Sequence, residues 1–482
     1  MPTPMKLPSF SHALLTFGSI VCVIGYGLFG LNTSLHALML ICLAIASFSA
    51  WYLQRGSFDQ IREAMNVGVG RAHSAIYILI LIGVLIAAFI QSGTVGAMVY
   101  YGMQYIGPAI FLPAGLILCS LMSLATGTSW GTAGTVGVVL MGIGDAMGIP
   151  LPLIAGMVVS GACFGDKMSP VSDSVVLASM SANVNVYAHI RSMMYTTVPT
   201  YIITLIAFSV IGMGYADKQL PAESLAALSA SIKSLYTINV LCLLPFFVLI
   251  GLSLKRVSAE VAMMSAVAVA VLLAVFMQGA NFTAVLGSLY DGVKVSSGSK
   301  AVDTMLNRGG ITSMMWTLSI AIMALALGGI LDAFGFLRVL ISAILSRAKS
   351  AFALVTTTSI SMVVGNMTMG EAYMSIILGG QLFSKPFDDQ GIDRVVLSRT
   401  LEEGATLTTP LIPWTTGGAF FAATLGVSPL AFAPWALLNW INILMGIAFA
   451  FFGLAIFRTK SAQTAQTAQS AQSAQTPQTA AA

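Results

Sequence analysis

The residues of this sequence with the clearest chemical potential are acidic side chains inside or beside long apolar stretches. These residues are Asp166, Asp173, Glu371, Glu402 and Glu403. Placing one charged group at the centre of a bilayer costs about 3 kcal/mol or more, so such residues are functional candidates by default. A carboxyl group removed from water holds its proton more tightly, because desolvation disfavours the charged form. Such a group can hold either a proton or a sodium ion, and that competition is a minimal mechanism for exchanging the two.

Four segments next to these carboxylates interrupt the apolar pattern with Gly, Pro, Ser and Thr. They are residues 127–132, 160–173, 365–371 and 401–416. Irregular backbone at membrane depth is tolerated only where protein buries it or water reaches it. The freed carbonyl groups and the hydroxyl groups supply the oxygen ligands that hard cations prefer. We therefore predict a cation- and proton-binding site built from Asp166, Asp173, Glu371, Glu403, Thr128, Ser129, Ser169, Ser172, Asn366, Thr368, Thr408 and Thr409, with Na⁺ at Asp166, Asp173 and Glu403.

The same residues also have structural interpretations. A hydroxyl group in a helix often bonds to the carbonyl of the preceding turn, and for any single Ser or Thr this is the commoner role. Lys167 follows Asp166, and Arg399 lies four residues before Glu403 on the same helical face, so either carboxylate could belong to an internal ion pair. The gathering of these residues in four broken segments favours a binding site.

The composition places these segments in a membrane protein. Of the 482 residues, 57% are hydrophobic and 8% are charged, against about 25% charged in a typical soluble domain. Mean hydropathy is +0.90. Many apolar runs reach the length of about 20 helical residues that crosses a bilayer, whereas a membrane β-barrel shows short alternating segments. We predict an all-α polytopic membrane protein with about 11–13 transmembrane helices, in two inverted-topology repeats with broken or re-entrant helices.

The charges between apolar runs predict how the chain is organised. We expect N-terminal spans in 1–54, a first repeat in 55–234, a second repeat in 235–457 and a disordered cytoplasmic tail in 458–482. The first apolar run lacks a small-residue cleavage site before a soluble domain, which favours a transmembrane helix over a signal peptide. The distribution of Lys and Arg between the spans predicts that both termini are cytoplasmic.

Self-similarity at a spacing near 240 residues predicts two related halves. In this alignment Gly131 faces Gly370, and Pro170 faces Pro410. Positive residues precede the apolar span at 73–91 but follow the matching span at 313–332, so the two halves are expected to cross the membrane in opposite directions. Inverted repeats recur in secondary transporters, where the site lies at the repeat interface. A duplication that builds only a scaffold is the alternative.

Other kinds of site find little support in the sequence. The five cysteines form no CxxC pair, and the four histidines have no metal-ligand spacing. No phosphate-binding loop, HExxH or GxSxG motif occurs, so we expect no enzyme activity, no nucleotide-driven pump and no cofactor, with Na⁺ only as a transported ion. The net charge of +4 is modest and no basic run interleaves with aromatic residues, which argues against a nucleic-acid partner.

From about residue 62 to residue 453 the chain resembles the NhaC family of sodium/proton antiporters. The resemblance is carried by GTSWGTAGTVGVVLMGIG at 127–144, SGACFGDKMSPVSD at 160–173 and LSRTLEEGATLTTPLIPWTTGGAFFAATLGV at 397–427. It implies a multi-pass exchanger of the bacterial inner membrane, within the wider ion-transporter superfamily, with an inverted-repeat fold and a homodimeric assembly. The ion ligands that it implies are Asp166, Ser169, Asp173, Glu403, Thr408 and Thr409.

Two departures from the family pattern bear on the transported solute. The family usually has Glu-Asp-Ser-Gly-Thr where this chain has Glu-Glu-Gly-Ala-Thr at 402–406, and often has Asn-Thr-Cys where this chain has Thr-Thr-Gly at 415–417. Some members resemble malate–lactate exchangers driven by sodium and protons, so an organic-acid exchanger is the alternative to Na⁺/H⁺ exchange. Another cotransported solute is a third hypothesis. A passive channel is a fourth, although a channel would not require titratable carboxylates in both repeats.

Overall fold

The structure is a computed structural model, and it describes residues 7–31, 33–53, 55–70, 73–105, 107–170, 172–216, 230–255, 257–296, 303, 306–307, 309–345 and 348–459. Within these ranges the chain is helical, and its extended backbone pairs only in an isolated antiparallel bridge between Ile392 and Arg458. The predicted tail lies outside the described residues from 460 onward.

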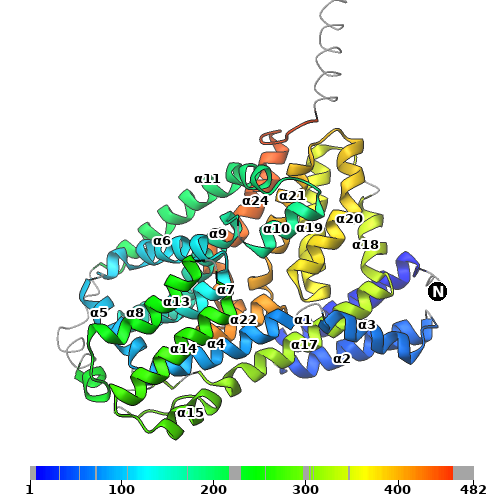
Figure 1. Ribbon diagram of the computed structural model, residues 1–482. Coiled ribbons are helices and arrows are strands. Elements are labelled where there is room, and N and C mark those ends of the chain that lie inside the picture. The colour runs from blue at the N-terminus through cyan, green and yellow to red at the C-terminus, as the bar shows by residue number, and fades with distance from the viewer. Residues whose placement is uncertain are drawn as a thin grey trace, which may run out of the picture.

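The N-terminal helices and the first half of the chain form one run of elements, coloured from blue to green in Figure 1. They are α1 (Phe10–Phe29), α2 (Leu35–Phe48), η1 (Ser49–Leu53), α3 (Phe58–Gly70), α4 (His73–Gln91), α5 (Thr94–Tyr105), α6 (Pro108–Thr126), α7 (Ser129–Thr132), η2 (Ala133–Gly137), α8 (Val138–Ala146), α9 (Leu151–Met168), α10 (Asp173–Ser181) and α11 (Val186–Met213).

The second half begins after a group of connecting helices. That group is η3 (Val240–Leu243), α13 (Leu244–Leu254), α14 (Ala259–Phe276) and α15 (Phe282–Asp291). The helices that follow are α17 (Ile311–Ala333), α18 (Phe336–Leu345), α19 (Ala351–Met369), α20 (Ala372–Asp389), α21 (Arg394–Ala405), η4 (Thr409–Leu411), α22 (Thr416–Leu425), α23 (Pro429–Phe432), η5 (Ala433–Trp435) and α24 (Leu437–Phe451).

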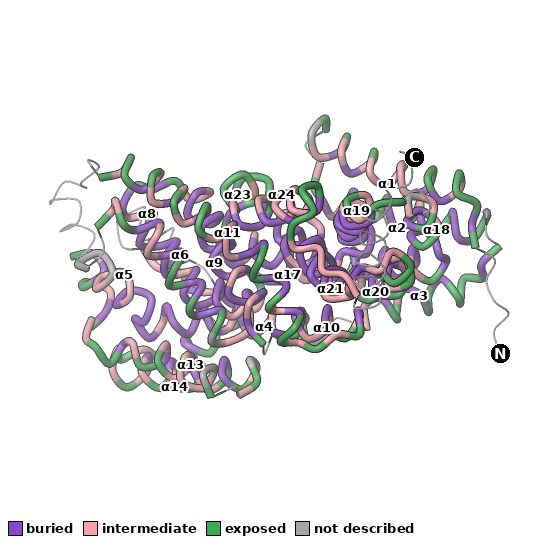
Figure 2. The backbone as a smooth tube through the Cα atoms, turned by 90° about the horizontal axis from the view of Figure 1, so that it is seen from above, coloured by how far each residue is buried: buried purple, intermediate pink, exposed green. Residues whose placement is uncertain are grey.

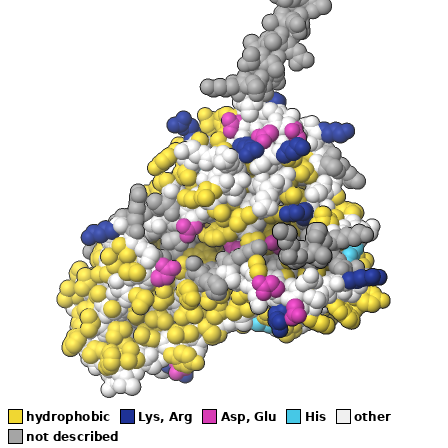
Figure 3. Space-filling model, turned by 45° about the vertical axis from the view of Figure 1, so that its right-hand side comes forward, with side chains coloured by type: hydrophobic (Ala, Val, Ile, Leu, Met, Phe, Trp, Pro, Cys, Tyr) yellow, Lys and Arg dark blue, Asp and Glu magenta, His cyan; other side chains and the backbone are white. Residues whose placement is uncertain are grey.

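The lengths and composition of these helices are those of a polytopic membrane protein. Six helices in the described ranges are long and apolar enough to cross a membrane, or up to eight if each of two bent pairs is one span. The bent pairs are Ile76–Gln91 with Thr94–Tyr101, at 69°, and Thr416–Leu425 with Pro429–Trp435, at 85°. Apolar side chains cover much of the lower part of the surface in Figure 3, while charged side chains gather toward the top and one flank. The predicted fold class, an all-α membrane protein with broken helices, is confirmed.

All four segments that were predicted to interrupt the membrane helices do so. Gly127 ends α6, and Gly370 ends α19, each with a left-handed backbone (φ +71° and +67°). Glycine suits these positions because it adopts positive φ without a Cβ penalty. In the other two segments α9 ends at extended Ser169, and α21 is followed by the short 3-10 helix η4 before α22 begins.

The helix boundaries of the two halves match at a spacing of 243 residues (370 − 127 = 243). The same spacing relates the N-caps of α9 and α21, which are Pro150 and Asp393, and the N-caps of α10 and α22. A hydrogen bond is repeated as well: Ser123 donates to the Ala162 carbonyl at 2.6 Å, and 243 residues later Asn366 donates to the Ala405 carbonyl at 2.6 Å.

The alignment that pairs Gly131 with Gly370 is therefore displaced by a few residues from the structural repeat. The structural partner of Gly370 is Gly127, and the partner of Pro170 is Pro413. Identical residues close to both positions made the sequence alignment ambiguous, and the caps resolve it.

Equivalent helices make equivalent contacts, both within each half and between the halves. Helix α6 packs on α9 and α19 packs on α21, while α9 also packs on α24 and α21 on α11. Reciprocal contacts of this kind are what a two-fold relation produces. Figure 2 shows buried residues along much of α6, α9 and α17, so these helices belong to the interior of the molecule.

Candidate functional site

The broken segments of both halves enclose a cavity of about 370 Å³. Its wall comes from the α6–α7 break, the end of α9, the start of α10, the start of α20, and the η4–α22 region. Pockets for small molecules usually measure about 300–1,000 Å³, so this cavity can hold a cation with several waters or a small organic ion.

The charged side chains of the cavity wall are all acidic. They are Asp166 and Asp173 from the first half and Glu371 from the second. Among the described residues that line the cavity, none is Lys, Arg or His. The neutral polar residues of the wall are Thr128, Ser129, Ser174, Tyr373, Thr406, Thr409 and Thr416. Carboxylate and hydroxyl oxygens together suit a hard cation.

Asp166 is held in place by the two breaks of the first half. Its Oδ2 accepts a hydrogen bond from the Ser129 backbone N–H at 3.1 Å, and its Oδ1 accepts from the Ser172 hydroxyl at 2.5 Å. Only 9% of Asp166 is exposed. Because Ser129 is the first residue of α7, the carboxylate lies at a helix N-terminus, where the backbone dipole favours negative charge.

Glu371 is the carboxylate that the second half contributes to the cavity wall. It is the N-cap of α20, and its Oε1 accepts from the Tyr373 backbone N–H at 3.4 Å. Its Oε2 accepts a short hydrogen bond from the Thr416 hydroxyl. Glu371 thereby links the start of α20 to the start of α22, so the break after α19 and the break before α22 meet at one carboxylate.

The two halves also meet through aromatic rings beside the cavity. Trp130 of α7 stacks on Phe420 of α22, with ring centroids 4.3 Å apart and an interplanar angle of 5°. Trp130, Tyr373 and Phe421 all line the cavity. These rings add aromatic surface to a wall that also carries the carboxylates.

A buried amide–hydroxyl cluster supports the second half of the site. The Asn366 amide nitrogen donates to the hydroxyls of Thr408 and Thr409 at 2.8 and 3.0 Å. The Asn366 carbonyl oxygen accepts from Ser375 at 2.8 Å. Only Thr409 of this cluster lines the cavity, so Asn366 and Thr408 position it from behind.

Glu403 lies outside the cavity, in a buried charged cluster. Its Oε1 is 3.8 Å from the Lys167 Nζ, and it accepts a short hydrogen bond from the Thr196 hydroxyl of α11. Lys167 and Glu403 are 0% and 3% exposed. The ion pair foreseen for Glu403 exists, but its partner is Lys167 instead of Arg399, whose guanidinium donates to the Ala455 carbonyl at 3.1 Å.

The structure brings most of the predicted site residues together. The residues that line the cavity are Asp166, Asp173, Glu371, Thr128, Ser129 and Thr409, and Ser172 contacts Asp166 directly. Those that do not line it are Glu403, Ser169, Asn366, Thr368 and Thr408. The Thr368 hydroxyl donates to the Val364 carbonyl at 2.8 Å, which is the local helical role weighed against ligation.

Sequence reasoning did not select four polar residues of the wall. Ser174 follows directly after the DKMSPVSD motif, Tyr373 follows the first break of the second half, and Thr406 and Thr416 lie within its second broken segment. The repeat was the signal that could have found one of them, because Thr416 lies 243 residues after Asp173 (416 − 173 = 243).

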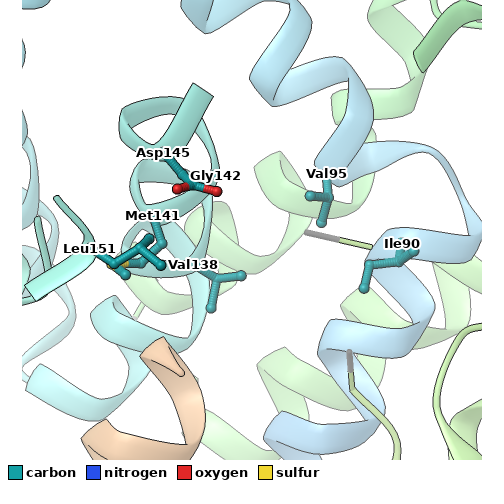
Figure 4. A pocket seen from close by; sticks show the side chains of 7 residues that line it. All are labelled: Ile90, Val95, Val138, Met141, Gly142, Asp145 and Leu151. Carbon is teal, nitrogen blue, oxygen red and sulfur yellow. The ribbon is translucent and has the colours of Figure 1, made fainter. Parts of the chain in front are cut away.

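A second hollow lies between α4, α5, α8 and α9 and is shown in Figure 4. Its volume is about 10 Å³, and Asp145 is its one acidic lining residue beside apolar side chains and Gly142. That volume holds about one water molecule, which is too little for transported cargo. Across the described ranges, no group of three or more His, Cys, Asp and Glu side chains is arranged to hold a metal ion.

Comparison with known proteins places this geometry in a family context. The model of the family described as "Na+/H+ antiporter family" matches residues 9–191 and 161–454. The Malate-2H(+)/Na(+)-lactate antiporter of Bacillus subtilis (strain 168) is 36% identical over 456 residues, covering 93% of this chain and 97% of that protein. The Na(+)/H(+) antiporter NhaC of Alkalihalophilus pseudofirmus is 35% identical over 457 residues, covering 95% and 98%. The arginine/ornithine antiporter ArcD of Halobacterium salinarum is 33% identical over 456 residues, covering 93% of each.

Proposed function

The chain belongs to the Na⁺/H⁺ antiporter family, and we propose that it is a secondary active transporter that exchanges Na⁺ for H⁺ across the inner membrane by alternating access. The observation that carries this proposal is the cavity wall, where three carboxylates face a common space with no basic side chain among the described lining residues. A wall of this charge attracts cations and protons and repels anions.

In the proposed mechanism, Asp166 is the main cation ligand. One of its oxygens is fixed by the Ser129 N–H and the other by the Ser172 hydroxyl, so the carboxylate is preorganised while the cavity side stays accessible. Hydroxyl groups of Thr128 and Thr409 supply neutral oxygens in the same wall. Cation binding and protonation of the acidic groups at the site exclude one another, so cation entry from one side releases a proton and cation exit restores it.

The proposal extends to assembly and orientation. We propose that the two halves related by 243 residues cross the membrane as inverted repeats, that both termini are cytoplasmic and that the protein is a homodimer. The domain limits proposed from the sequence are 1–54, 55–234, 235–457 and 458–482. In this account the protein is not an enzyme, needs no cofactor and has no nucleic-acid partner; Na⁺ and H⁺ are its cargo and the lipid bilayer is its surroundings.

An organic-acid exchanger coupled to Na⁺ and H⁺ is the second candidate. Two observations favour it: the 36% identity to the Malate-2H(+)/Na(+)-lactate antiporter, and a cavity volume larger than one bare cation requires. The acidic wall argues against it, because a dicarboxylate would approach Asp166, Asp173 and Glu371 without a basic side chain in the described lining to balance its charge.

Purified protein in liposomes tests the two candidates directly. The vesicles contain a pH-sensitive dye and carry an outwardly directed proton gradient, and NaCl, LiCl, KCl or choline chloride is added outside. We expect Na⁺ alone to make the lumen more alkaline, with choline as the control for ionic strength. A lumen that responds only after malate or lactate is added would refute simple cation/proton exchange and support the organic-acid candidate.

A further inference from the structure

One fully buried carboxylate next to the cavity has no part in the mechanism described so far. Glu402 of α21 is 0% exposed and is not among the residues that line the cavity. Its Oε1 accepts a hydrogen bond from the Ser174 hydroxyl at 2.9 Å. Ser174 does line the cavity, so a single hydroxyl group separates Glu402 from the space in which the cation would bind.

Ser174 also continues toward Asp166. Its hydroxyl oxygen lies 3.1 Å from that of Ser172, and the Ser172 hydroxyl donates to Asp166 Oδ1 at 2.5 Å. Two serines therefore join Asp166 of the first half to Glu402 of the second in one continuous chain of hydrogen-bond distances. We propose that Glu402 is a proton-binding site distinct from the cation site, and that Ser174 and Ser172 couple its proton to cation occupancy at Asp166.

The donor capacity of the serines explains the coupling. Each hydroxyl has one hydrogen to donate and can also accept. While Asp166 is free of a cation, Ser172 donates to it, and the Ser172 oxygen can accept from Ser174. Ser174 can then accept from a protonated Glu402. In this state every hydrogen in the chain points from Glu402 toward Asp166, and the proton on Glu402 is stabilised.

A cation on Asp166 reverses this direction. The cation takes the place of the Ser172 hydrogen at the carboxylate oxygen, so Ser172 donates to Ser174 instead, and Ser174 donates to Glu402. Glu402 then acts only as an acceptor, which favours its ionised form. Its proton passes to the Ser174 oxygen while the original Ser174 hydrogen leaves to cavity water. One cation enters, one proton leaves, and Glu402 becomes a carboxylate.

The surroundings of Glu402 are consistent with a change of charge there. From α9 it is influenced by Asp166 and Lys167, and from α20 Tyr373 lies within its electrostatic reach. Cys163 of α9 is a further titratable neighbour, and His189 of α11 faces the same cluster, where it contacts Ser398 at 2.9 Å. Helix α10 brings Asp173, and α21 itself carries Arg399, which acts on the same Lys167. Helices α19 and α24 contribute no charged residue to this region.

Glu402 differs in this respect from the adjacent Glu403. Glu403 lies 3.8 Å from the cationic Lys167 Nζ and also accepts from Thr196. The hydrogen bond of Glu402 comes from the neutral hydroxyl of Ser174. An ammonium group beside a carboxylate favours its ionised form, whereas a reorientable hydroxyl can donate to the ionised form or accept from the protonated form.

Infrared difference spectroscopy of the full-length protein in liposomes tests the inference without relying on transport. Spectra are recorded across a pH titration in choline chloride and again after exchange into NaCl of equal ionic strength. We expect a band of a protonated carboxylic acid in choline chloride that is lost on addition of Na⁺. The band should be absent from the Glu402→Gln protein, and its persistence there would overturn the assignment.

Serine variants test the coupling. In Ser174→Ala we expect the band to remain but its loss on Na⁺ addition to slow by roughly tenfold or more, since a positioned proton-transfer group is gone. Ser174→Thr retains the hydroxyl and should restore the rapid response. Ser179→Ala is the matched control, because Ser179 lies on the same helix and donates only to the Val176 carbonyl at 2.7 Å. Equal rates in Ser174→Ala and Ser179→Ala would overturn the relay.

The coupling rests on the proposed Na⁺/H⁺ exchange, and the outcomes separate the two ideas. If the native protein exchanges ions in liposomes but shows no band that depends on Glu402, the proton site is wrong and the exchange function stands. If the Glu402 band is present but Na⁺ neither removes it nor moves protons, the exchange function and its coupling fail while the proton site stands.

Discussion

The two halves of this protein share a backbone framework but differ in side-chain chemistry at equivalent places. Positions 243 residues apart pair Thr128 with Glu371, Asp166 with Thr409, and Asp173 with Thr416. In each pair one half contributes a carboxylate and the other a hydroxyl group. All six residues line the same cavity.

This alternation limits repulsion inside the cavity. If both halves carried the carboxylate of each pair, six acidic groups would share a space of about 370 Å³, and like charges held close together disfavour the ionised form. The observed arrangement has three acidic groups, and the equivalent residue in the other half is a threonine in each case. The two halves share the breaks and caps, and differences between their side chains leave a wall whose charged residues are all acidic.

The supporting contacts differ between the halves as well. Asp166 receives its hydrogen bonds from the two breaks of its own half, through Ser129 and Ser172. Its counterpart Thr409 is held by Asn366, which also bonds Thr408 and Ser375. Asp166 in the first half is therefore a fixed carboxyl group, whereas Thr409 in the second half is a fixed neutral hydroxyl group.

The largest expected effect comes from neutralising the acidic member of the Asp166–Thr409 pair. We expect Asp166→Asn to reduce Na⁺-dependent proton exchange by at least about 100-fold, because losing a buried charged partner costs roughly 3 kcal/mol and 1.4 kcal/mol corresponds to tenfold. The measurement is dye-reported exchange in liposomes at matched protein density. Thr409→Ala is the paired control, with a smaller expected loss, and equal losses in both variants would remove the distinction between the halves.

A smaller effect is expected at the acidic member of the Thr128–Glu371 pair. Glu371→Gln keeps an oxygen that can accept from the Tyr373 N–H, so the cap of α20 survives while the charge is lost. We expect exchange to fall roughly tenfold, corresponding to about 1.4 kcal/mol, with unchanged monodispersity in detergent. With the amide oxygen facing the Tyr373 N–H, the amide nitrogen faces Thr416, whose hydroxyl can accept from it. Because both contacts can persist, a complete loss of exchange would indicate that Glu371 is itself the principal cation ligand.

The glycines that end α6 and α19 allow a test of the backbone structure that the two halves share, independent of the ion-binding side chains. Gly127 and Gly370 both have left-handed backbone, but a Cβ on Gly370 would lie only 2.8 Å from the Ala324 Cβ. We expect Gly370→Ala to cost about 1–3 kcal/mol in stability, from backbone strain together with this contact. The apparent Tm in detergent should fall more in Gly370→Ala than in Gly148→Ala, because Gly148 also has a left-handed backbone but no heavy atom lies within 4 Å of an added Cβ. The reverse order would contradict the close contact between Gly370 and Ala324 of α17.

The sequence predicted the broken helices because glycine, proline and small polar residues stand out against an apolar background. It also predicted that Asp166, Asp173 and Glu371 would share one site, since a carboxylate at membrane depth needs a water-accessible cavity. It could not distinguish Glu403 from Glu402, because adjacent helical residues point about 100° apart. The direction of each depends on how α21 packs on α10, α11, α19 and α20.

The internal repeat shows the same limit at the level of alignment. Local identity favoured Gly131 as the partner of Gly370, whereas backbone conformation makes Gly127 the partner. A glycine that ends a helix is required there by its positive φ angle, whereas a glycine matched by residue type alone has no such requirement. The repeats of a glycine-rich membrane protein are therefore aligned more reliably by their helix caps than by residue identity. The proton-site proposal for Glu402 depended on three-dimensional contacts with Ser174, 228 positions away in sequence.

The smallest effect is expected for a charged pair that lies away from the four broken segments. Its variant serves as the control for the charge-removing variants at Asp166 and Glu371. Arg394 lies 2.6 Å from Asp388 and lowers the pKa of that carboxyl group through a side-chain hydrogen bond. The pair is partly exposed (32% and 45%), so its contribution is about 0.2–1 kcal/mol. Because the pKa is lowered on folding, this stability is present above the unfolded pKa of Asp388 and is lost as pH falls through the lower folded pKa.

Asp388→Asn should therefore lower the apparent Tm only slightly at neutral pH and leave it unchanged in acid below the folded pKa. We expect ion exchange in liposomes to be the same as in the native protein. A marked loss of exchange in this variant would mean that removing any acidic residue impairs transport, and the contrast between Asp166 and Thr409 would then no longer locate the cation site.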